Sequence, residues 1–520
     1  MASGGERPKG KMRKWVIALA VVIVIGVIVF HRLTSGLPDY IRDRAVSTLR
    51  EHFDCDVTFK NFQVSIFPEI QISGEELVLR QQDKQGFPPL ITIRRFSTRA
   101  GLLQLVRKPS HVRRVSLDGL KITVPPREKK PKTPEPSPPK GPPPFSVVVD
   151  EIVSNNSELD MLPRDSRKLP RIFYIQHLSL AHAGLGEAMS FRARLTNPQP
   201  PGQIDAQGHF GPWQKDDPSL TPMDGQYTFA HANLDAIRGL GGILSSRGKF
   251  TGLLQRVDVV GETDTPDFSL DLANHPVHLR TEFHAIVDGT TGNTLLDPVR
   301  AKIESSPVAA RGGVFRATGV ERRTVLLDAT GTHAKLEDLL RLAVKAGTPP
   351  LTGWVNFKTR IDIPPGRGSI SDRLKLDGRF DVSSARFSKL NVQQKLLALS
   401  RRGRGAPEEQ GQGSVVFDLR GKFVLRNGLM TFSNLTFGVP GALVQLNGTY
   451  QLRGEAIDFR GTLRLQAKLS QTVGGWKSIL LKPVDPLFAK RGAGTLVPIK
   501  VTGTGSDPQF GVEIGRVFKQ

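Results

Sequence analysis

A long alternation of apolar and polar residues runs from Ile457 to Leu469, over thirteen positions. Successive side chains of a β-strand point to opposite faces, so this pattern predicts one strand with an apolar and a polar face. At about 3.3 Å per residue the strand would extend roughly 40 Å, about twice the usual length. The apolar face is expected to consist of Ile457, Phe459, Leu463, Leu465, Ala467 and Leu469.

The same alternation recurs from Val277 to Val287 and from Val355 to Ile363. In these segments the apolar positions are Val277, Leu279, Phe283, Ala285 and Val287, and then Val355, Phe357, Ile361 and Ile363. The ordinary explanation of any one such strand is a half-buried member of an antiparallel sheet, whose apolar face is covered by other side chains. What covers the apolar faces is therefore the functional question.

The composition favours many strands joined by tight turns. The chain has 520 residues with 52 Gly and 38 Pro, enough for about three domains or one elongated array. Asp-Gly and Asn-Gly pairs, which are typical of hairpin turns, begin at Asp118, Asp224, Asp288, Asp377, Asn427 and Asn447. We expect a mainly all-β fold.

The N-terminal region predicts a membrane anchor. Sixteen consecutive uncharged residues extend from Trp15 to Phe30. A helix of this length falls short of a bilayer core of about 30 Å, so it is expected to continue through Leu33, giving a transmembrane helix over residues 15–33. A cleaved signal peptide is the alternative, but no A-x-A-like site follows. The anchor candidates are Trp15, Val16, Ile17, Leu19, Val22, Ile25, Val29 and Phe30.

Basic residues before the anchor, including Lys11, Arg13 and Lys14, predict its orientation. By the positive-inside rule, residues 1–14 are a cytoplasmic tail and nearly all the rest lies across the membrane. Cys55 is the single cysteine, which excludes an intrachain disulfide. The net charge of +23 then favours anionic lipid over nucleic acid as a partner, although a solvated surface is the preferred explanation for each individual charge.

The rest of the chain is expected to divide at breaks in the strand pattern. An amphipathic helix is predicted at residues 37–53, an N-terminal β unit at 34–124, a Pro-rich linker at 125–144, a central β region at 145–400, a Gly-rich break at 401–413 and a C-terminal β unit at 414–520. Further helices are predicted from Asn233 to Leu240, from Thr332 to Ala346 and from Lys389 to Ser400. Thr332 is expected to cap the second of these.

Motifs for catalysis are missing from the sequence. It contains no HExxH, no CxxC pair and no GxSxG, and the segment Gly242 to Lys249 departs from a phosphate-binding loop in its glycine spacing. The densest histidines are His275, His278 and His284, of which the last two occupy polar strand positions. We therefore expect no enzyme, no metal site and no cofactor.

The order of segments resembles the AsmA family of inner-membrane-anchored periplasmic proteins. An anchor and a helix precede Asp56 to Ile70, which is similar to an early strand segment of that family that ends in a proline. Further similar stretches are Pro89 to Phe96, Val115 to Ile122, Leu195 to Ile204, Gly208 to Trp213, Gly421 to Phe432 and Pro498 to Pro508. The Pro-rich segment from Pro125 to Pro144 departs from the family pattern.

The resemblance implies an elongated, twisted, antiparallel β-groove related to bridge-like lipid transfer proteins, with TamB, YhdP and chorein-type proteins as relatives. It implies a single-pass protein of the bacterial inner membrane, with its bulk in the periplasm, that acts in outer-membrane biogenesis and carries phospholipid between membranes. An alternative role is an assembly factor that influences outer-membrane protein assembly or protein targeting to the membrane without carrying lipid. Phospholipids, the inner membrane and envelope proteins are the expected partners.

The lipid-groove candidates are the inward positions of the longest alternating strands. They are Val277, Leu279, Phe283, Val287, Val355, Phe357, Ile361, Ile457, Phe459, Leu463, Leu465 and Leu469. Acyl chains would lie along them while headgroups remain in water, and each CH₂ removed from water contributes about 0.8 kcal/mol. Two rivals would share these strands. A scaffold would have its apolar faces closed by opposing sheets, and a periplasmic enzyme would need a clustered polar site.

Overall fold

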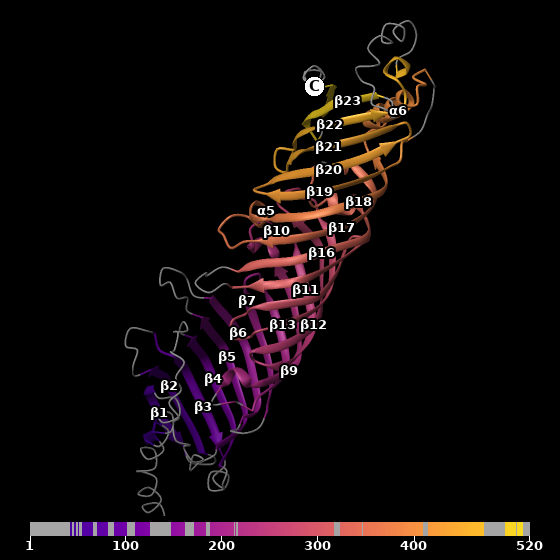
Figure 1. The fold of residues 1–520 in the computed structure, drawn as a ribbon. Helices are drawn as coiled ribbons and strands as arrows, with labels where there is room; N and C mark the ends of the chain where they lie inside the picture. Colours follow the sequence, from indigo (N-terminus) through magenta and orange to yellow (C-terminus); the bar gives the residue numbers. More distant parts are fainter. Residues whose placement is uncertain are drawn as a thin grey trace, which may run out of the picture. The chain divides into compact units, whose positions relative to one another are not determined.

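The computed structural model describes residues 42–43, 46–47, 50, 55–65, 70–81, 88–100, 110–124, 147–161, 171–183, 188–212, 214, 217–316, 323–345, 347–408, 414–472, 495–505 and 507–512. The chain forms two compact units, Met1–Leu195 and Thr196–Gln520. Strands dominate both units, as the ribbon in Figure 1 shows, so the predicted mainly β fold is confirmed. The finer division into N-terminal, linker, central and C-terminal parts stays a prediction.

Unit 1 is a sheet of successive strands. Its strands are β1 (Cys55–Ser65), β2 (Ile70–Gln81), β3 (Ile91–Ala100), β4 (Ser110–Val124), β5 (Val147–Met161) and β6 (Arg171–Ala183), and β7 (Met189–Pro198) crosses the boundary between the units. Each of β1 to β5 pairs with the next strand along the chain. Buried Val57, Leu77, Leu79 and Ile93 form its core.

One pairing in unit 1 differs from the antiparallel sheet that the sequence predicts. Strands β4 and β5 are parallel, with Ser110 opposite Val147 and Val124 opposite Met161. A parallel pair needs a crossover connection of a dozen or more residues, whereas an antiparallel pair can be joined by a tight turn. The Pro-rich segment 125–144 lies within this connection and outside the described residues.

The described residues of the predicted helix at 37–53 are helical. Val46 packs against the core of unit 1, and the guanidinium of Arg42 lies 5.4 Å from the ring centroid of Phe59. The predicted anchor, including Trp15 to Phe30 and the topology residues Lys11, Arg13 and Lys14, lies outside the described residues. Within the part of the chain that is described, no helix is long and apolar enough to cross a membrane.

Unit 2 continues the succession of strands. They are β8 (Pro201–Phe210), β9 (Pro222–Asn233), β10 (Leu240–Gly241), β11 (Ile243–Leu253), β12 (Arg256–Leu270), β13 (Val277–Val287), β14 (Thr294–Ile303), β15 (Ser306–Phe315), β16 (Thr324–Lys335), β17 (Leu351–Ile363), β18 (Lys375–Phe387), β19 (Phe417–Arg426), β20 (Leu429–Val439), β21 (Ala442–Gln451), β22 (Ala456–Leu465), β23 (Thr495–Thr504) and β24 (Pro508–Val512). Each of these strands pairs antiparallel with the next strand along the chain, with one exception. The short strand β10 pairs with β12, and β9 pairs with β11.

Short helices lie between the strands of unit 2. They are α4 (Leu336–Leu340), α5 (Ile370–Arg373) and α6 (Leu390–Gly403), together with the 3₁₀ turns η1 (Pro218–Leu220), η2 (Leu234–Ala236) and η3 (Leu469–Thr472). The helix predicted from Lys389 to Ser400 is confirmed as α6. The helix predicted from Asn233 to Leu240 is wrong, because only the turn η2 forms and Leu240 then pairs with Leu270 of β12.

The start of the helix predicted from Thr332 is also wrong. Thr332 remains in β16, and α4 begins at Leu336 without a side-chain cap. Its buried Asp338 accepts hydrogen bonds from the Ser305 amide at 3.2 Å and from the Ser306 hydroxyl at 2.8 Å. These partners come from the β14–β15 turn, so local sequence could not reveal where the helix starts.

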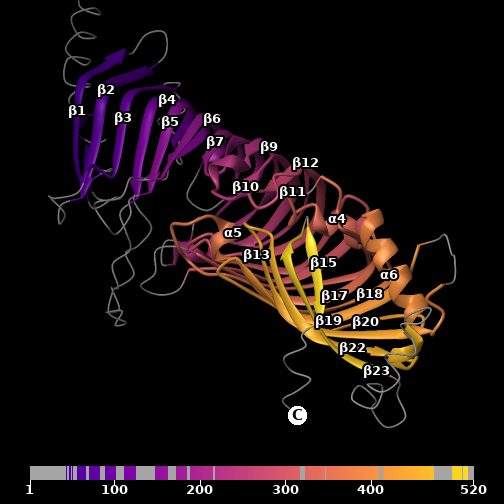
Figure 2. The same cartoon turned by 90° about the horizontal axis from the view of Figure 1, so that it is seen from above.

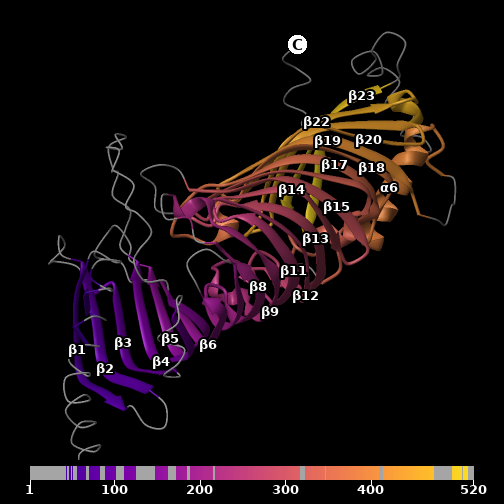
Figure 3. The ribbon, with the colours of Figure 1, turned by 90° about the horizontal axis from the view of Figure 1, so that it is seen from below.

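The sheet of unit 2 curls toward one face, as Figure 2 and Figure 3 show. Leu272 from the β12–β13 connection packs with Leu425 of β19 and Leu452 of the β21–β22 turn. These residues lie far apart in strand order, so their contact requires strong curvature. Helices α4 and α6 lie along one margin of this sheet and α5 lies at the opposite margin (Figure 2).

Candidate functional site

One face of the unit 2 sheet carries an uninterrupted row of uncharged residues. Directly opposed residues of paired strands share a face. The central row contains Tyr227, Gly248, Gly261, Phe283, Val299, Ala310, Ala329, Thr359, Gly378, Phe423, Phe432, Gly448, Phe459, Val501 and Phe510. It crosses the paired strands from β9 to β24 without one charged side chain among these described positions.

Two parallel rows flank the central row and are equally free of charged residues. One contains Phe229, Ser246, Thr263, Thr281, Ala301, Val308, Gly331, Phe357, Phe380 and Gly421. The other contains Gly225, Phe250, Val259, Ala285, Leu296, Gly312, Leu327, Ile361, Leu376, Leu425, Met430, Tyr450, Ile457, Gly503 and Pro508. We call the three rows the inner face.

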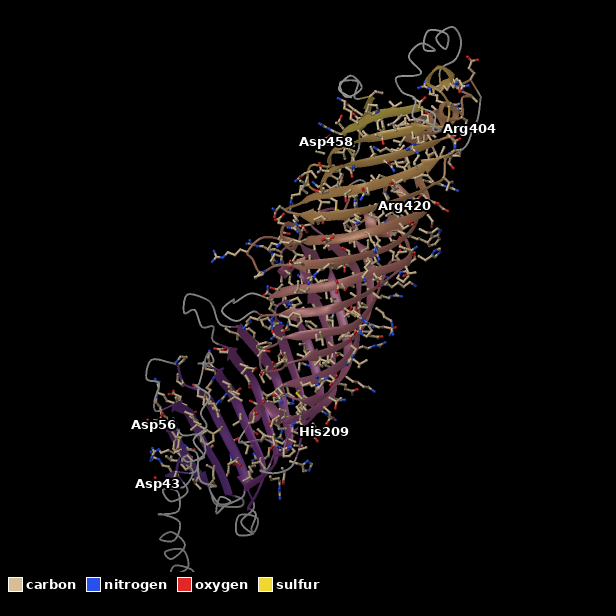
Figure 4. The ribbon with its side chains drawn as sticks, viewed as in Figure 1. Asp43, Asp56, His209, Arg404, Arg420 and Asp458 are labelled. Carbon is tan, nitrogen blue, oxygen red and sulfur yellow. The ribbon has the colours of Figure 1, made fainter. Side chains whose placement is uncertain are left out.

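The intervening residues of the same strands point outward and carry the charges. Asp264 accepts hydrogen bonds from His278 and Arg280 at 2.6 and 3.2 Å, and Arg247 pairs with Glu262. The bond from His278 is the main cause that lowers the pKa of Asp264. Figure 4 marks two further outward residues, Arg420 of β19 and Asp458 of β22. The charge of the chain in these strands is therefore kept off the inner face.

Phenylalanine rings concentrate on the inner face of strands β17 to β22. The centroids of Phe432 and Phe459 are 5.8 Å apart, and those of Phe380 and Phe423 are 6.1 Å apart. Phe380 also meets Phe432 edge to face at 6.3 Å. These rings are half-buried and form one apolar surface, which we call the phenylalanine section, with Phe357 as its remaining member.

Glycines stand opposite several of these rings. A Cβ added to Gly378 would lie 2.8 Å from Phe423 Cζ, and one added to Gly448 would lie 2.6 Å from Phe459 Cδ1. Real Cβ atoms do not approach other atoms this closely, so the rings occupy space that only glycine leaves free. The glycines therefore let the rings lie down on the neighbouring strand instead of standing upright on the inner face.

Hydroxyl groups stand beside the rings of Phe229, Phe250 and Phe283 in the same rows at strands β9 to β13. The Thr263 and Thr281 hydroxyl oxygens are 2.7 Å apart, and the Tyr227 hydroxyl lies 3.2 Å from that of Ser246. Burial raises the pKa of Tyr227, more than its bond to Ser246 lowers it, so this phenol stays neutral. We call Tyr227, Ser246, Thr263 and Thr281 the hydroxyl patch.

Helix α6 covers one margin of the inner face. Its Leu396 packs in the largest core cluster, which includes Val355 and Val382. The Ser400 hydroxyl donates to the Pro440 carbonyl at 2.8 Å, and the Lys395 ammonium lies 4.9 Å from the ring centroid of Phe510. The helix thus fixes the strand ends and leaves the phenylalanine section itself half-buried.

The opposite margin is held by ion pairs between distant turns. Arg453 of the β21–β22 turn contacts Asp372 of α5 at 2.7 Å and Asp271 of the β12–β13 connection at 3.2 Å. Ser369 and Ser371 donate hydrogen bonds to Asp271. We call these five residues the clasp.

The predicted site residues lie mainly where the alternation placed them. Inward positions are held by Leu279, Phe283, Val287, Phe357, Ile361, Ile457, Phe459 and Leu463, and buried inward positions by Val277, Val355 and Leu465. Val355 and Leu465 belong to the core beside α6, so they are closed by protein rather than half-buried.

The predicted strand from Ile457 to Leu469 is wrong at its C-terminal end. Strand β22 ends at Leu465, and Leu469 begins the turn η3. The amide of Ala467 donates to the Gly403 carbonyl at the end of α6 at 2.9 Å, which takes it off the sheet ladder. The alternation continues in the sequence, but tertiary contacts end the strand.

Gly225, Gly378 and Gly448 of the inner face were missed by the sequence analysis because their Asp-Gly or Asn-Gly pairs were assigned to turns. The pairs Asp377-Gly378 and Asn447-Gly448 lie inside β18 and β21, as do those at Asp118 and Asp224 inside β4 and β9. Of the six predicted pairs, those at Asp288 and Asn427 form turns. Asn427 and Gly428 both have positive φ, as a hairpin turn of this kind requires. A glycine followed by a phenylalanine on the next strand was the available signal.

The described residues contain no group of three or more His, Cys, Asp or Glu side chains that could hold a metal ion. His278 and His284 lie outward, where they contact Asp264 and Asp258. Comparison of the chain with protein-family models, with curated proteins and with solved structures found no match.

Proposed function

We propose that this chain carries the acyl chains of phospholipids along the inner face of unit 2. The observation that carries the proposal is the central row, which has fifteen directly opposed residues without a charged side chain, whereas charged side chains occur at many of the outward positions of the same strands. Half-buried Phe380, Phe432 and Phe459 leave apolar area in contact with solvent. Exposed apolar patches of this kind are typical of binding surfaces.

An acyl chain fits the chemistry of this face. Its CH₂ groups make no hydrogen bonds, and the inner face offers aromatic and aliphatic groups on a sheet whose backbone groups are already paired. Each CH₂ removed from water contributes about 0.8 kcal/mol, so a chain needs no specific polar contact to be held. Charged headgroups would remain in water at the open side, because an unpaired charge on an apolar face is costly.

The cellular setting of the proposal comes from the sequence. The apolar residues 15–33 and the basic residues before them support a single-pass anchor in the inner membrane with the two units in the periplasm. The resemblance to the AsmA family supports a bacterial protein of outer-membrane biogenesis that moves lipid in a groove. The alternative is an assembly factor for outer-membrane proteins that carries no lipid.

Photo-crosslinking in cells tests the proposal. A photoreactive amino acid at Phe459 or Phe283 should capture phospholipid, and the same amino acid at the outward neighbours Arg460 and Glu282 should not. Adjacent strand residues face opposite sides, so each pair differs in face and hardly in position. Capture of protein alone at both inward positions would support the assembly factor and overturn lipid carriage.

A further inference from the structure

The hydroxyl patch interrupts an otherwise apolar row. Ser246, Thr263 and Thr281 are directly opposed on β11, β12 and β13, and the row continues through Ala301 and Val308. Thr263 and Thr281 are half-buried, so a molecule lying on the inner face can reach them. Three neighbouring strands thus present hydroxyl groups in this row, whereas the later strands contribute only apolar residues to it.

The hydrogen atoms of the patch are not all used within the protein. Ser246 donates to the Glu262 carbonyl at 2.9 Å, so Tyr227 is the donor in its bond to Ser246. In the Thr263–Thr281 pair only one hydroxyl can donate to the other. The hydrogen of the accepting hydroxyl has no acceptor among the described residues and remains available to a ligand.

A second observation on β12 points the same way. Thr265, the next inward residue after Thr263, is fully buried, and its hydroxyl has no hydrogen-bond partner in the described part of the chain. Buried hydroxyl groups are nearly always paired, since an unpaired one loses its hydration without compensation. The hydrogen-bonding capacity of the inward hydroxyl groups on β12 therefore exceeds what the described residues use.

The available hydrogen suits an uncharged acceptor. None of the three inner-face rows carries a cation that could offset a phosphate or a carboxylate, and an unpaired charge would be costly there. An ester carbonyl is uncharged, accepts such a hydrogen bond and is joined directly to an acyl chain. It can dock on the patch while the chain lies on apolar neighbours such as Phe283 and Val259.

We propose that the hydroxyl patch binds the ester carbonyl groups of acyl lipids and so favours ester-linked over ether-linked chains. The inference rests on the proposed function, because it assigns the part of the lipid that contacts β11 to β13. The acyl chains extend from this patch over the small residues of β14 to β16 toward the phenylalanine section. The patch thus gives the inner face a preference that an apolar surface alone does not have.

Competition between two lipids tests the inference. The full-length chain in detergent is incubated with vesicles of equal parts dioleoyl phosphatidylethanolamine and its diether analogue, and the bound lipid is quantified by mass spectrometry. The wild-type chain should retain the diester lipid about three- to tenfold over the diether lipid, as expected for one hydrogen bond. The double variant Thr263→Val and Thr281→Val should retain both equally.

Matched variants separate the effect of losing the hydroxyl group from the effect of changing the shape of the side chain. Thr281→Ser keeps a hydroxyl and should keep the preference. Thr330→Val is the control outside the inner face, because Thr330 lies outward on β16 and its hydroxyl donates to the Ala309 carbonyl at 3.5 Å, and this variant should also keep the preference. Equal retention by the wild-type chain, or a preference that survives in the double variant, would overturn the inference and leave lipid carriage standing. Absence of both lipids would overturn the proposed function and the inference with it.

Discussion

The inner face of unit 2 has two sections that solve the same steric problem with different residues. In strands β17 to β22, rings such as Phe423 and Phe459 lie over Gly378 and Gly448 of the adjacent strands. In strands β11 to β16 the rows consist largely of small residues, of which Ala301, Ala310 and Ala329 are examples. Both arrangements keep side chains close to the sheet.

The difference lies in what each section offers a ligand. The phenylalanine section is half-buried, aromatic and without a hydrogen-bond donor in its central ring cluster, whereas the hydroxyl patch at the start of the small-residue section provides one free donor hydrogen. A long sheet with one apolar face can therefore bind one kind of molecule along its length and still distinguish the parts of that molecule.

A charge in the phenylalanine section should have the largest effect. Phe432→Asp removes the contacts with Phe380 and Phe459 and places a carboxylate on the inner face. We expect the free energy of unfolding to fall by about 3 kcal/mol and lipid retention to fall at least tenfold. Urea unfolding and mass spectrometry of the full-length chain in detergent measure both.

The control for this charge is Thr431→Asp, which adds the same group at the exposed outward neighbour. It should leave both quantities nearly unchanged. A similar loss of lipid in both variants would show that net charge, rather than the inner face, governs lipid retention.

A methyl group on a ring-facing glycine should have a smaller effect. A Cβ at Gly448 would lie 2.6 Å from Phe459 Cα, which is backbone and cannot turn aside, so we expect Gly448→Ala to destabilise the chain by about 2 kcal/mol. A Cβ at Gly421 would meet Leu435 Cδ1 at 3.2 Å and Phe380 Cζ at 3.3 Å, which are side-chain ends. Gly421→Ala should therefore cost less than half as much in urea unfolding, and equal losses would show that the backbone contact at Gly448 is no more costly than the side-chain contacts at Gly421.

The clasp should give the smallest effect, because its ion pairs are largely exposed. It joins the β12–β13 connection to the strands of the phenylalanine section. Arg453→Ala should lower the free energy of unfolding by less than about 1 kcal/mol at pH 7. Differential hydrogen exchange of the two connected turns should detect the loosening even where the unfolding midpoint barely moves.

The contribution of the clasp should depend on pH. Burial raises the pKa of Asp271, but hydrogen bonds from Ser371, Ser369 and Arg453 outweigh it, so this pKa lies below its ordinary value of 3.8. A carboxyl group with a lowered pKa stabilises the folded chain at pH values above its ordinary pKa. This stabilisation is lost as the pH falls through the lowered pKa. The difference between wild type and Arg453→Ala should therefore shrink below about pH 4. A difference that persists at pH 2 would exclude Asp271 as its origin.

Local alternation was sufficient to assign the faces of many strands. Ile457, Phe459 and Leu463 lie inward as predicted, because the strand period of two residues depends only on the extended backbone. The helix α6 was also predictable, since its apolar residues repeat at helical spacing. Asn427-Gly428 marks a hairpin because both residues readily adopt positive φ, which the turn requires.

Pairs of residues from different strands could not be assigned in this way. Asp377-Gly378 has the same local signature as Asn427-Gly428, yet it lies within β18, where Gly378 is paired with Thr359 of β17 and Phe423 of β19. Likewise, Thr263 and Thr281 form a pair only through the register of β12 and β13. Such contacts depend on which residues the pairing brings opposite each other.

The sequence by itself therefore determined the class of the fold, the strand faces and the separation of apolar from charged positions, because these follow from local backbone periodicity. Only the tertiary structure decided where β22 ends, that β4 and β5 are parallel, which glycines lie under rings and which hydroxyl groups meet. These features depend on strand register and on contacts between residues distant in sequence, and the interactions that fix them act through space rather than along the chain.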